Sequence, residues 1–407
     1  MSVARLGAMR FISVALMLVQ NLLIVRFLSL DEIGKYYLIV TIAYLGNAIV
    51  FVGADFYLQK RNSSFSVDHK SSVNGLLLFI VVTAVAGGSL VWSTSAYYFY
   101  VSAQNWFLLA FLCGGLAVGN YLSGLGRNLL QLAAQPVRSG IGPIVEGVLK
   151  VLLIIFIVAS TEAVSGVDVA VIGCIATWVA GIITLKLFVN LSINTKVSYL
   201  NEPRRLLSTL IPIGGGGFLN WVQLQSYRPL IAVDSNGVQA VGAISLLSTL
   251  GSILSNSVFS ILAQLEVPRQ YQSNGISSIK YLQKIALLAA LLCLLCIPGS
   301  MVFLWLTGKV QLMGLVYFVV LGVLIEAGNS IIGVCVNHLN IIGRSMWYLP
   351  VAGLAGSVFV YGFLFLSPPV IDVYLKVAVA LFFGQLIAVC VVLATTYRIS
   401  KRLKYVE

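Results

Sequence analysis

Long apolar stretches separated by short polar segments recur along the whole chain. Each is close to the roughly 20 residues that an α-helix needs to cross the hydrocarbon layer of a bilayer. The stretches run at Ala4–Phe27, Gly34–Leu58, Ser72–Thr94, Trp106–Leu125, Ile141–Ser160, Val167–Val189, Leu207–Val233, Val238–Leu262, Tyr281–Leu306, Leu312–Val336, Trp347–Leu366 and Tyr374–Tyr397. The pattern predicts an all-α polytopic membrane protein with about twelve transmembrane helices.

A polar linker at Asn201-Glu202-Pro203-Arg204-Arg205 separates two groups of six predicted helices. The two halves begin in a similar but differently spaced way, with Val19-Gln20, Arg26, Leu30-Asp31 and Gly34 in the first and Val222-Gln223, Arg228, Val233-Asp234 and Gly242 in the second. Such a duplication is typical of transporters whose halves enclose a substrate site. We therefore expect a six-helix bundle in residues 1–200, a second in residues 201–407, and a central cavity between them.

The composition agrees with a membrane protein. Hydrophobic residues make up 59% and charged residues 9% of the 407 residues, and the mean hydropathy is +0.99. A soluble domain has about a quarter of its residues charged. The net charge of +12 is spread over the predicted loops, whereas a nucleic-acid-binding protein gathers such charge on one soluble face. We expect the lipid bilayer, and no nucleic acid, as a partner.

The loop charges predict an orientation. Most of the 25 Lys and Arg residues lie in the predicted loops of one side, together with both termini, and the opposite side has Arg26, Lys35, Lys309 and Lys376. Cytoplasmic loops are the ones enriched in Lys and Arg. We therefore expect both termini in the cytoplasm.

Two opposite charges lie inside the predicted helix at Gly140–Ser160. At about 1.5 Å per residue, Lys150 is roughly 15 Å from the start of this stretch, near the middle of the bilayer. Charges at that depth face a bundle interior or a hydrated cavity and indicate a functional path. Alternatively Glu146 and Lys150, four residues apart on one helix face, neutralise each other.

Enzyme functions find little support. The chain has no G-x-x-x-x-G-K-[ST] segment for nucleotide binding, and its longest predicted outward loop, near Ser95–Asn105, is too short for the large external loop of membrane polymerases and ligases. All six cysteines lie inside apolar stretches, which favours neither a disulfide framework nor a zinc site. We expect a non-enzyme with no metal and no organic cofactor.

The first two predicted helices carry a short motif. Arg26-Phe-Leu-Ser-Leu-Asp-Glu-Ile-Gly34-Lys-Tyr-Tyr is followed by a helix ending Val52-Gly53-Ala54-Asp55 and then by Lys60-Arg61. This resembles the opening of the polysaccharide flippases, the O-antigen and capsule-unit translocases of the multidrug/oligosaccharidyl-lipid/polysaccharide exporter superfamily. The second half echoes it from Tyr227-Arg228 to Gly242, with Tyr227 where relatives often have an acid and Ala243 where they often have a Tyr.

The resemblance implies a flippase for an undecaprenyl-pyrophosphate-linked oligosaccharide. Such a protein moves the headgroup from the cytoplasmic to the periplasmic leaflet of the bacterial inner membrane by alternating access, for O-antigen, lipopolysaccharide or other surface polysaccharide synthesis. A polysaccharide polymerase and a chain-length regulator are the further partners it implies.

Several residues suit such a substrate. Lys150 and Arg228 are the cations inside predicted helices and Arg26 is at the outer end of the first, and such cations recognise pyrophosphate. The alternatives are interfacial snorkelling for Arg228 and a contact with the turn at Asp31 and Glu32 for Arg26.

Aromatic and amide side chains near Arg228 are candidates for sugar binding. Trp221 and Tyr227 flank the same face of the predicted helix as Gln223 and suit stacking on sugar rings or hydrogen bonds to hydroxyls, although aromatics near span ends also anchor helices at the interface.

The glycine run Gly214, Gly215, Gly216 and Gly217 weakens its helix and predicts an interruption or hinge. The other interpretation is close helix packing.

Acidic residues inside the predicted helices are candidates for ion coupling. Glu326 has no basic neighbour on its own helix, and Glu146 and Asp55 are the other acids considered. We expect one of them, Glu146 or Glu326 first, to bind H⁺ or Na⁺ whose inward movement drives export. The alternative is an interhelical ion pair of Glu326 with Arg228 or Lys150.

Two other functions remain open. A cation-coupled multidrug or small-molecule antiporter of the same superfamily would need a more acidic and aromatic cavity. A membrane polysaccharide polymerase would be favoured by a large external loop.

Overall fold

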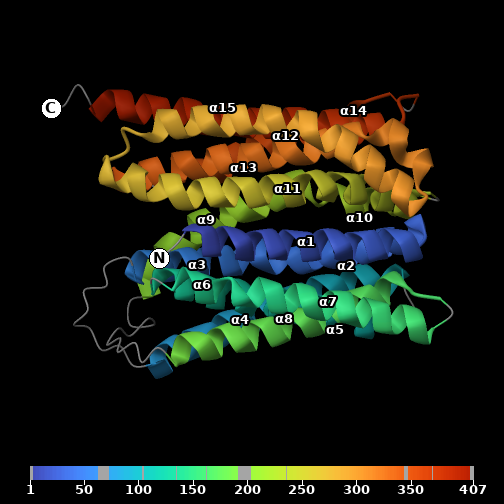
Figure 1. Ribbon diagram of the computed structural model, residues 1–407. Coiled ribbons are helices and arrows are strands. Elements are labelled where there is room, and N and C mark those ends of the chain that lie inside the picture. Colours follow the sequence, from blue (N-terminus) through green and yellow to red (C-terminus); the bar gives the residue numbers. More distant parts are fainter. Residues whose placement is uncertain are drawn as a thin grey trace. The chain divides into compact units, whose positions relative to one another are not determined.

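The structure is a computed structural model that describes residues 3–62, 73–102, 105–133, 135–161, 163–190, 203–234, 236–342, 347–368 and 370–403, and all its regular elements there are helices (Figure 1). The predicted all-α class is confirmed. The chain divides into two compact units, unit 1 at Met1–Phe218 and unit 2 at Leu219–Glu407. The division falls inside a helix, beyond the polar linker at which the two six-helix bundles were predicted to meet.

Unit 1 contains the first eight α-helices and the start of the ninth. They are α1 (Val3–Phe27), α2 (Leu30–Gly46), α3 (Val52–Asn62), α4 (Val73–Ser102), α5 (Trp106–Leu132), α6 (Pro136–Ser139), α7 (Ile141–Ser160), α8 (Gly166–Val189) and α9 (Pro203–Leu224). A single π-helical turn, η1 (Asn47–Phe51), joins α2 to α3, so the apolar length from Leu30 to Leu58 is one continuous helical span.

Unit 2 contains the end of α9 and the remaining helices. They are α10 (Tyr227–Ile231), α11 (Gly237–Gln272), α12 (Ser278–Thr307), the 3-10 turn η2 (Val310–Leu315), α13 (Tyr317–Ile341), α14 (Tyr348–Leu366) and α15 (Val373–Leu403). Gly308, in the left-handed conformation that favours glycine, ends α12.

Eleven helices of the described residues are long and apolar enough to cross a membrane, which agrees with the predicted number of about twelve. The predicted seventh helix, Leu207–Val233, is the one that is not among these eleven. The structure forms two helices there, α9 and α10, with a turn at Gln225 and Ser226. The protein is therefore a multi-pass membrane protein in which α9 and α10 form a broken helix.

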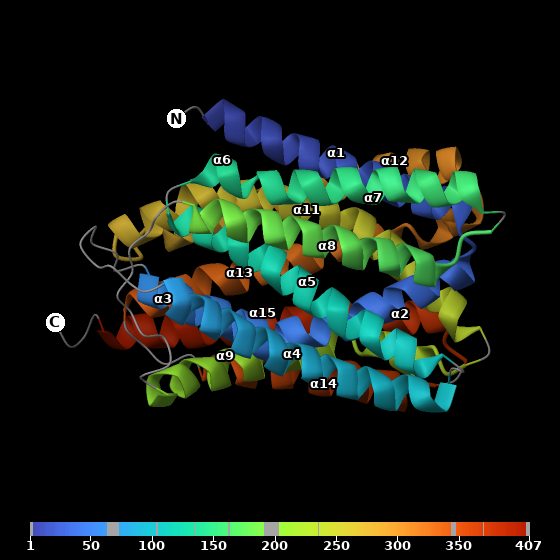
Figure 2. The same ribbon diagram turned by 90° about the horizontal axis from the view of Figure 1, so that it is seen from below.

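The core of each unit is made by helices packed along their length (Figures 1 and 2). In unit 1, α5 packs against α4 and α8, and the rings of Phe51 and Tyr121 stack with centroids 4.2 Å apart. In unit 2, α11 packs against α13, where a Cβ on Gly251 or Gly322 would meet a backbone carbonyl of the facing helix. Small residues thus let these helices approach closely, as is common in membranes.

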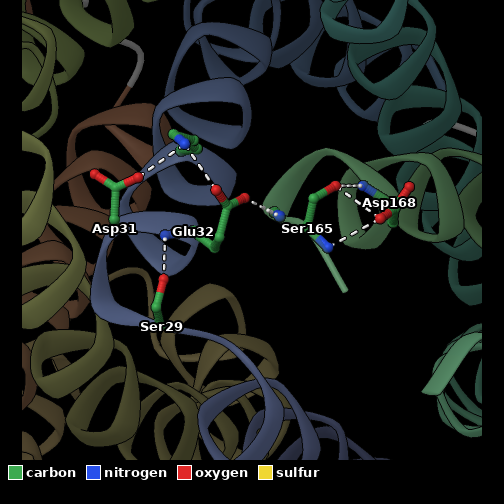
Figure 3. Close-up of polar contacts among 7 residues, drawn as sticks. Ser29, Asp31, Glu32, Ser165 and Asp168 are labelled. Carbon is green, nitrogen blue, oxygen red and sulfur yellow. Dashed lines mark hydrogen bonds and ion pairs between the residues drawn. The ribbon is translucent and has the colours of Figure 1, made fainter. Parts of the chain in front are cut away.

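The N-termini of α2 and α8 meet in unit 1, as Figure 3 shows. Ser29 caps α2, and Ser165 and Asp168 form a capping box at α8. Glu32 Oε2 accepts a hydrogen bond of 2.7 Å from the backbone N–H of Gly166, and Lys35 pairs with Asp31 and Glu32 at 2.8 and 2.7 Å. These contacts fix one end of α2 against α8.

Candidate functional site

Opposite charges of α7 lie within the helix packing of unit 1. Lys150 Nζ and Glu146 Oε1 are 2.6 Å apart, with 16% and 22% of the side chains exposed, and Ser123 of α5 donates a 3.4 Å hydrogen bond to Glu146 Oε2. The predicted pairing of the two residues is therefore formed. Lys150 also interacts electrostatically with Tyr36 and Tyr44 of α2, so the pair is not isolated from other polar groups.

The carboxyl of Asp55 is the next polar group in unit 1. Asn128 Nδ2, on α5, donates a hydrogen bond of 2.6 Å to Asp55 Oδ2. Asp55 Oδ1 is buried and has no hydrogen-bond partner among the described residues. A buried acceptor oxygen without a hydrogen-bond partner can bind a proton, a cation or a hydrogen-bond donor of a ligand.

Arginines connect these groups. Arg127 of α5 interacts electrostatically with both Asp55 and Glu146, and it repels Arg10 of α1. We call Arg10, Asp55, Arg127, Asn128, Glu146 and Lys150 the unit 1 cluster. Its charged members are three cations and two carboxyls from α1, α3, α5 and α7.

The sequence pattern did not predict Arg127 and Asn128 as members of this cluster. The predicted fourth helix ended at Leu125, which left both residues in a loop, whereas α5 continues to Leu132. The signal was the apolar run after them, because Leu129 and Leu130 are buried on the continued helix. Arg10 was assigned to the charged side of the membrane and not to a site.

Arg228 of unit 2 lies directly after the break between α9 and α10. Its side chain is buried, with Nε 3.3 Å from the Tyr227 hydroxyl, its guanidinium carbon 5.7 Å from the centre of that ring, and a hydrogen bond from Nη1 to Gln225 Oε1. A guanidinium over an aromatic face is a favourable arrangement. The structure therefore brings the predicted residues Arg228 and Tyr227 together.

Gln223 is placed differently. Because α9 ends at Leu224, Gln223 and Tyr227 do not share a face of one helix, as the sequence had suggested. Gln223 is fully buried and donates a 2.9 Å hydrogen bond to Gln385 of α15. Trp221 is half-buried near the end of α9, and Arg26 is exposed in the last turn of α1.

The glycine run does not interrupt its helix. The break expected at Gly214–Gly217 is wrong in position. The helix α9 continues through these residues and ends later, at Leu224. A Cβ on Gly214 or Gly217 would meet the backbone carbonyl of Ile49 or Ala48 in η1. Close packing, the other interpretation, is what the structure has, and a hinge role stays a prediction.

Glu326 lies in the middle of α13 in unit 2. Its carboxyl is hydrogen-bonded to the side chains of Asn329 and Ser252. These partners are neutral, and the first is one turn along the same helix. Asn329 also accepts from Gln385, which sequence reasoning did not connect to the site. Among the described residues, no three His, Cys, Asp or Glu side chains form a group that would hold a metal ion.

Comparison with known proteins gives the fold a class. No protein-family model matches the sequence, and no curated protein sequence matches it significantly. Solved structures do match over nearly the whole chain. An outward-facing multidrug resistance MATE family transporter of the MOP superfamily has a TM-score of 0.68 at 13% identity, with 99% of this chain and 96% of that chain covered.

Further solved structures agree. A MOP superfamily transporter from Pyrococcus furiosus, described as having a binding pocket of reverse polarity that suggests a different function, has a TM-score of 0.67 at 14% identity over 98% of this chain and 96% of its own. A mutant of the Vibrio cholerae MATE transporter VcmN has a TM-score of 0.66 at 13% identity over 98% and 97%. The protein therefore has the fold of the MOP superfamily transporters.

Proposed function

We propose that the protein is a flippase for an undecaprenyl-pyrophosphate-linked oligosaccharide in the bacterial inner membrane. It would move the sugar headgroup from the cytoplasmic to the periplasmic leaflet for O-antigen or another surface polysaccharide. The observation that carries the proposal is the excess of positive charge in the unit 1 cluster. Arg127 and Lys150 interact with its two carboxyls, and Arg10 adds a third cation beside Arg127.

The chemistry of the substrate explains why this excess matters. A pyrophosphate and hydroxyl-rich sugars cannot cross hydrocarbon unaided, so a carrier must supply cations and hydrogen-bonding groups inside its bundle. Arg127 and Arg10 suit planar phosphate recognition and Lys150 a point contact. The two arginines lie toward the predicted cytoplasmic ends of α5 and α1, where such a headgroup would enter.

Ion coupling completes the proposed cycle. Asp55 and Glu326 each have a neutral hydrogen-bond partner, Asn128 for the first and Asn329 for the second. They are therefore better placed than Glu146, which Lys150 neutralises, to exchange H⁺ or Na⁺. A polysaccharide polymerase and a chain-length regulator are the proposed partners, because the flipped unit must be consumed on the other side.

A second candidate is a cation-coupled multidrug antiporter. The solved structures that match include multidrug resistance MATE transporters, and acids such as Asp55 and Glu326 would suit a cationic drug. The Pyrococcus furiosus protein is described as differing in function with the polarity of its pocket. By the same reasoning, the positive excess in the unit 1 cluster favours an anionic substrate here.

The test is complementation of a deletion strain. The gene is deleted in its native host, and wild type, Arg127→Ala, Lys150→Ala and Arg228→Ala are restored at equal membrane levels, with surface polysaccharide assayed by gel. Arg269→Ala is the matched control, because Arg269 pairs at 2.8 Å with Glu266, which keeps a second partner in Lys284. We expect deletion to abolish polysaccharide, the control to restore it, and the three variants to restore less than about a tenth.

The outcomes separate the candidates. If polysaccharide persists in the deletion strain and the cells instead become sensitive to cationic drugs, the antiporter is the function. If polysaccharide is lost but all three variants restore it fully, the flippase stands, and neither the unit 1 cluster nor Arg228 is its substrate site.

A further inference from the structure

A chain of side-chain amides crosses the interior of unit 2. It begins at Gln223 on α9, passes through Gln385 on α15 and ends at Asn329 and Glu326 on α13. Gln223 is 0% and Gln385 4% exposed. Amides buried in a membrane bundle are costly unless each is hydrogen-bonded, so a chain of three is a built feature that needs an explanation.

The packing around the chain is fitted to it. A Cβ on Gly328 of α13 would meet the Gln385 amide, and a Cβ on Gly356 of α14 would meet the Gln223 amide. Glycines therefore make the space in which the two glutamine side chains lie.

A backbone carbonyl sets the direction, from donor to acceptor, of the hydrogen bonds along the whole amide chain. Gln385 Nε2 donates to the carbonyl oxygen of Ile325 at 3.4 Å and to Asn329 Oδ1 at 3.2 Å. A carbonyl only accepts, so the nitrogen of Gln385 must face α13 and its oxygen must face α9. Gln223 must then present its nitrogen to Gln385, as it does at 2.9 Å.

The hydrogen bonds at the two ends of the amide chain have the same direction. An ionised Glu326 carboxylate only accepts, so its hydrogen bond with Asn329 comes from the nitrogen of Asn329, while Asn329 Oδ1 accepts from Gln385. All three amides then donate toward Glu326. This direction puts Gln223 Oε1 at the other end, where it is a buried acceptor with no hydrogen-bond partner among the described residues.

The direction makes the chain sensitive to the charge on Glu326. A hydrogen bond to an ionised carboxylate is roughly twice as strong as one to a neutral group, and aligned bonds polarise one another. Among the described side chains, the other charged residues of the helices that pack against α13 lie nearer the helix ends. They are Glu266 and Arg269 on α11, Lys280 and Lys284 on α12, and Lys376, Arg398 and Lys401 on α15, and the titratable His338 lies near the end of α13 itself.

The amide chain holds the end of α9 in place through Gln223. Gln223 lies one residue before the end of α9, and the turn at Gln225 and Ser226 leads directly to Arg228. We propose that Gln385 and Asn329 are positioning residues that couple the charge state of Glu326 to the end of α9, and through it to Arg228. When a cation or proton neutralises Glu326, the chain weakens and the α9 end loosens. The proposal rests on the proposed role of Glu326 in ion coupling.

The test measures the α9 end directly and needs no substrate. Hydrogen exchange of the peptide spanning Gln225–Ile231 is followed by mass spectrometry in the purified full chain. The proteins compared are wild type, Glu326→Gln, Gln385→Met, Asn329→Ala and the double variant of Glu326 and Gln385. Glu326→Gln imitates the neutral acid. We expect exchange to rise several-fold to about tenfold in each single variant, with no further rise in the double variant.

Ser357→Ala is the matched control, because Ser357 of α14 anchors α9 through a 2.9 Å hydrogen bond to the Leu219 carbonyl and lies outside the chain. Its effect should add to that of Glu326→Gln. If Glu326→Gln leaves exchange unchanged while Gln385→Met raises it, Gln385 only anchors α9 and the coupling is refuted. Because exchange is read without transport, this outcome is independent of the polysaccharide assay.

Discussion

At the scale of the residue, the ion pair of Glu146 and Lys150 is the feature that most needs a test. A single charge in the middle of a bilayer costs about 2.5–3.5 kcal/mol on insertion scales, and an opposite charge at 2.6 Å offsets part of that penalty. Neutralisation alone would explain why the two residues occur together. If Lys150 also binds substrate, transport should still require it when the Glu146 charge has been removed as well.

A double-mutant cycle separates the two roles. Lys150→Met removes the 2.6 Å ion-pair partner of Glu146 and leaves it only Ser123 and the charge of Arg127, so we expect a lower apparent melting temperature of the purified protein. Glu146→Gln alone is the second single variant of the cycle. Replacing both residues, with Glu146→Gln and Lys150→Met, should recover much of the loss, with a coupling energy of about 1–3 kcal/mol. If Lys150 also binds substrate, the double variant regains stability but not polysaccharide. A double variant that regains both leaves Lys150 with a structural role.

How far residues could be predicted depends on their surroundings in the sequence. Glu146, Lys150 and Glu326 stand out because each charge interrupts a continuous apolar run. Arg127 and Asn128 do not, because hydropathy falls around them before the helix ends. Gln385 and Asn329 are uncharged, and only the folded unit shows that they meet each other and Glu326.

At the scale of the element, α9 depends on its glycines for close packing. Gly214 and Gly217 face the carbonyls of Ile49 and Ala48 in η1, with no space for a Cβ. The π-turn of η1 lies in the helical span that carries Asp55 a few residues later. The contact between α9 and η1 therefore fixes the backbone close to one member of the unit 1 cluster.

Gly217→Ala tests this contact. The added methyl must push α9 away from Ala48, and we expect this to destabilise the protein by about 1–3 kcal/mol, although alanine by itself favours a helix. Apparent melting temperature is the measurement. Gly124→Ala in α5 is the control, because a Cβ there has no described atom within 4 Å, and it should be neutral or slightly stabilising. Equal effects of both changes would contradict the packing role.

The elements show where sequence patterns stop being informative. Periods and lengths of apolar runs predicted the spanning helices well, because a bilayer imposes both. They did not predict the break at Gln225 and Ser226 or the π-turn at Asn47–Phe51. Glycine content indicated an interruption in α9, but neighbouring backbone in unit 1 stabilises the helix there, and such tertiary packing leaves no mark in a local sequence window.

At the scale of the whole molecule, the distribution of charge predicts how the chain is oriented in its membrane. Arg26, Lys35, Lys309 and Lys376 lie on the predicted outer side, and most of the other cations lie on the side of both termini. The alternation requires an even number of crossings. The described residues supply eleven candidate spans, and α9 with α10 must make the remaining crossing, although the break lowers their apolar length.

Labelling of single introduced cysteines measures this orientation directly. The six native cysteines are replaced, and one cysteine is introduced at Ala163, between α7 and α8, or at Ser273, between α11 and α12. If both termini are cytoplasmic and α9 with α10 cross the membrane, a membrane-impermeant maleimide added to intact cells labels Ala163→Cys and not Ser273→Cys. In lysed cells it labels both.

Ser273 follows α9 and α10 in the chain and Ala163 precedes them. Labelling of both positions in intact cells would therefore mean that α9 and α10 do not complete a crossing, and the positive excess near Arg269 and Lys284 would then face outward against the usual rule.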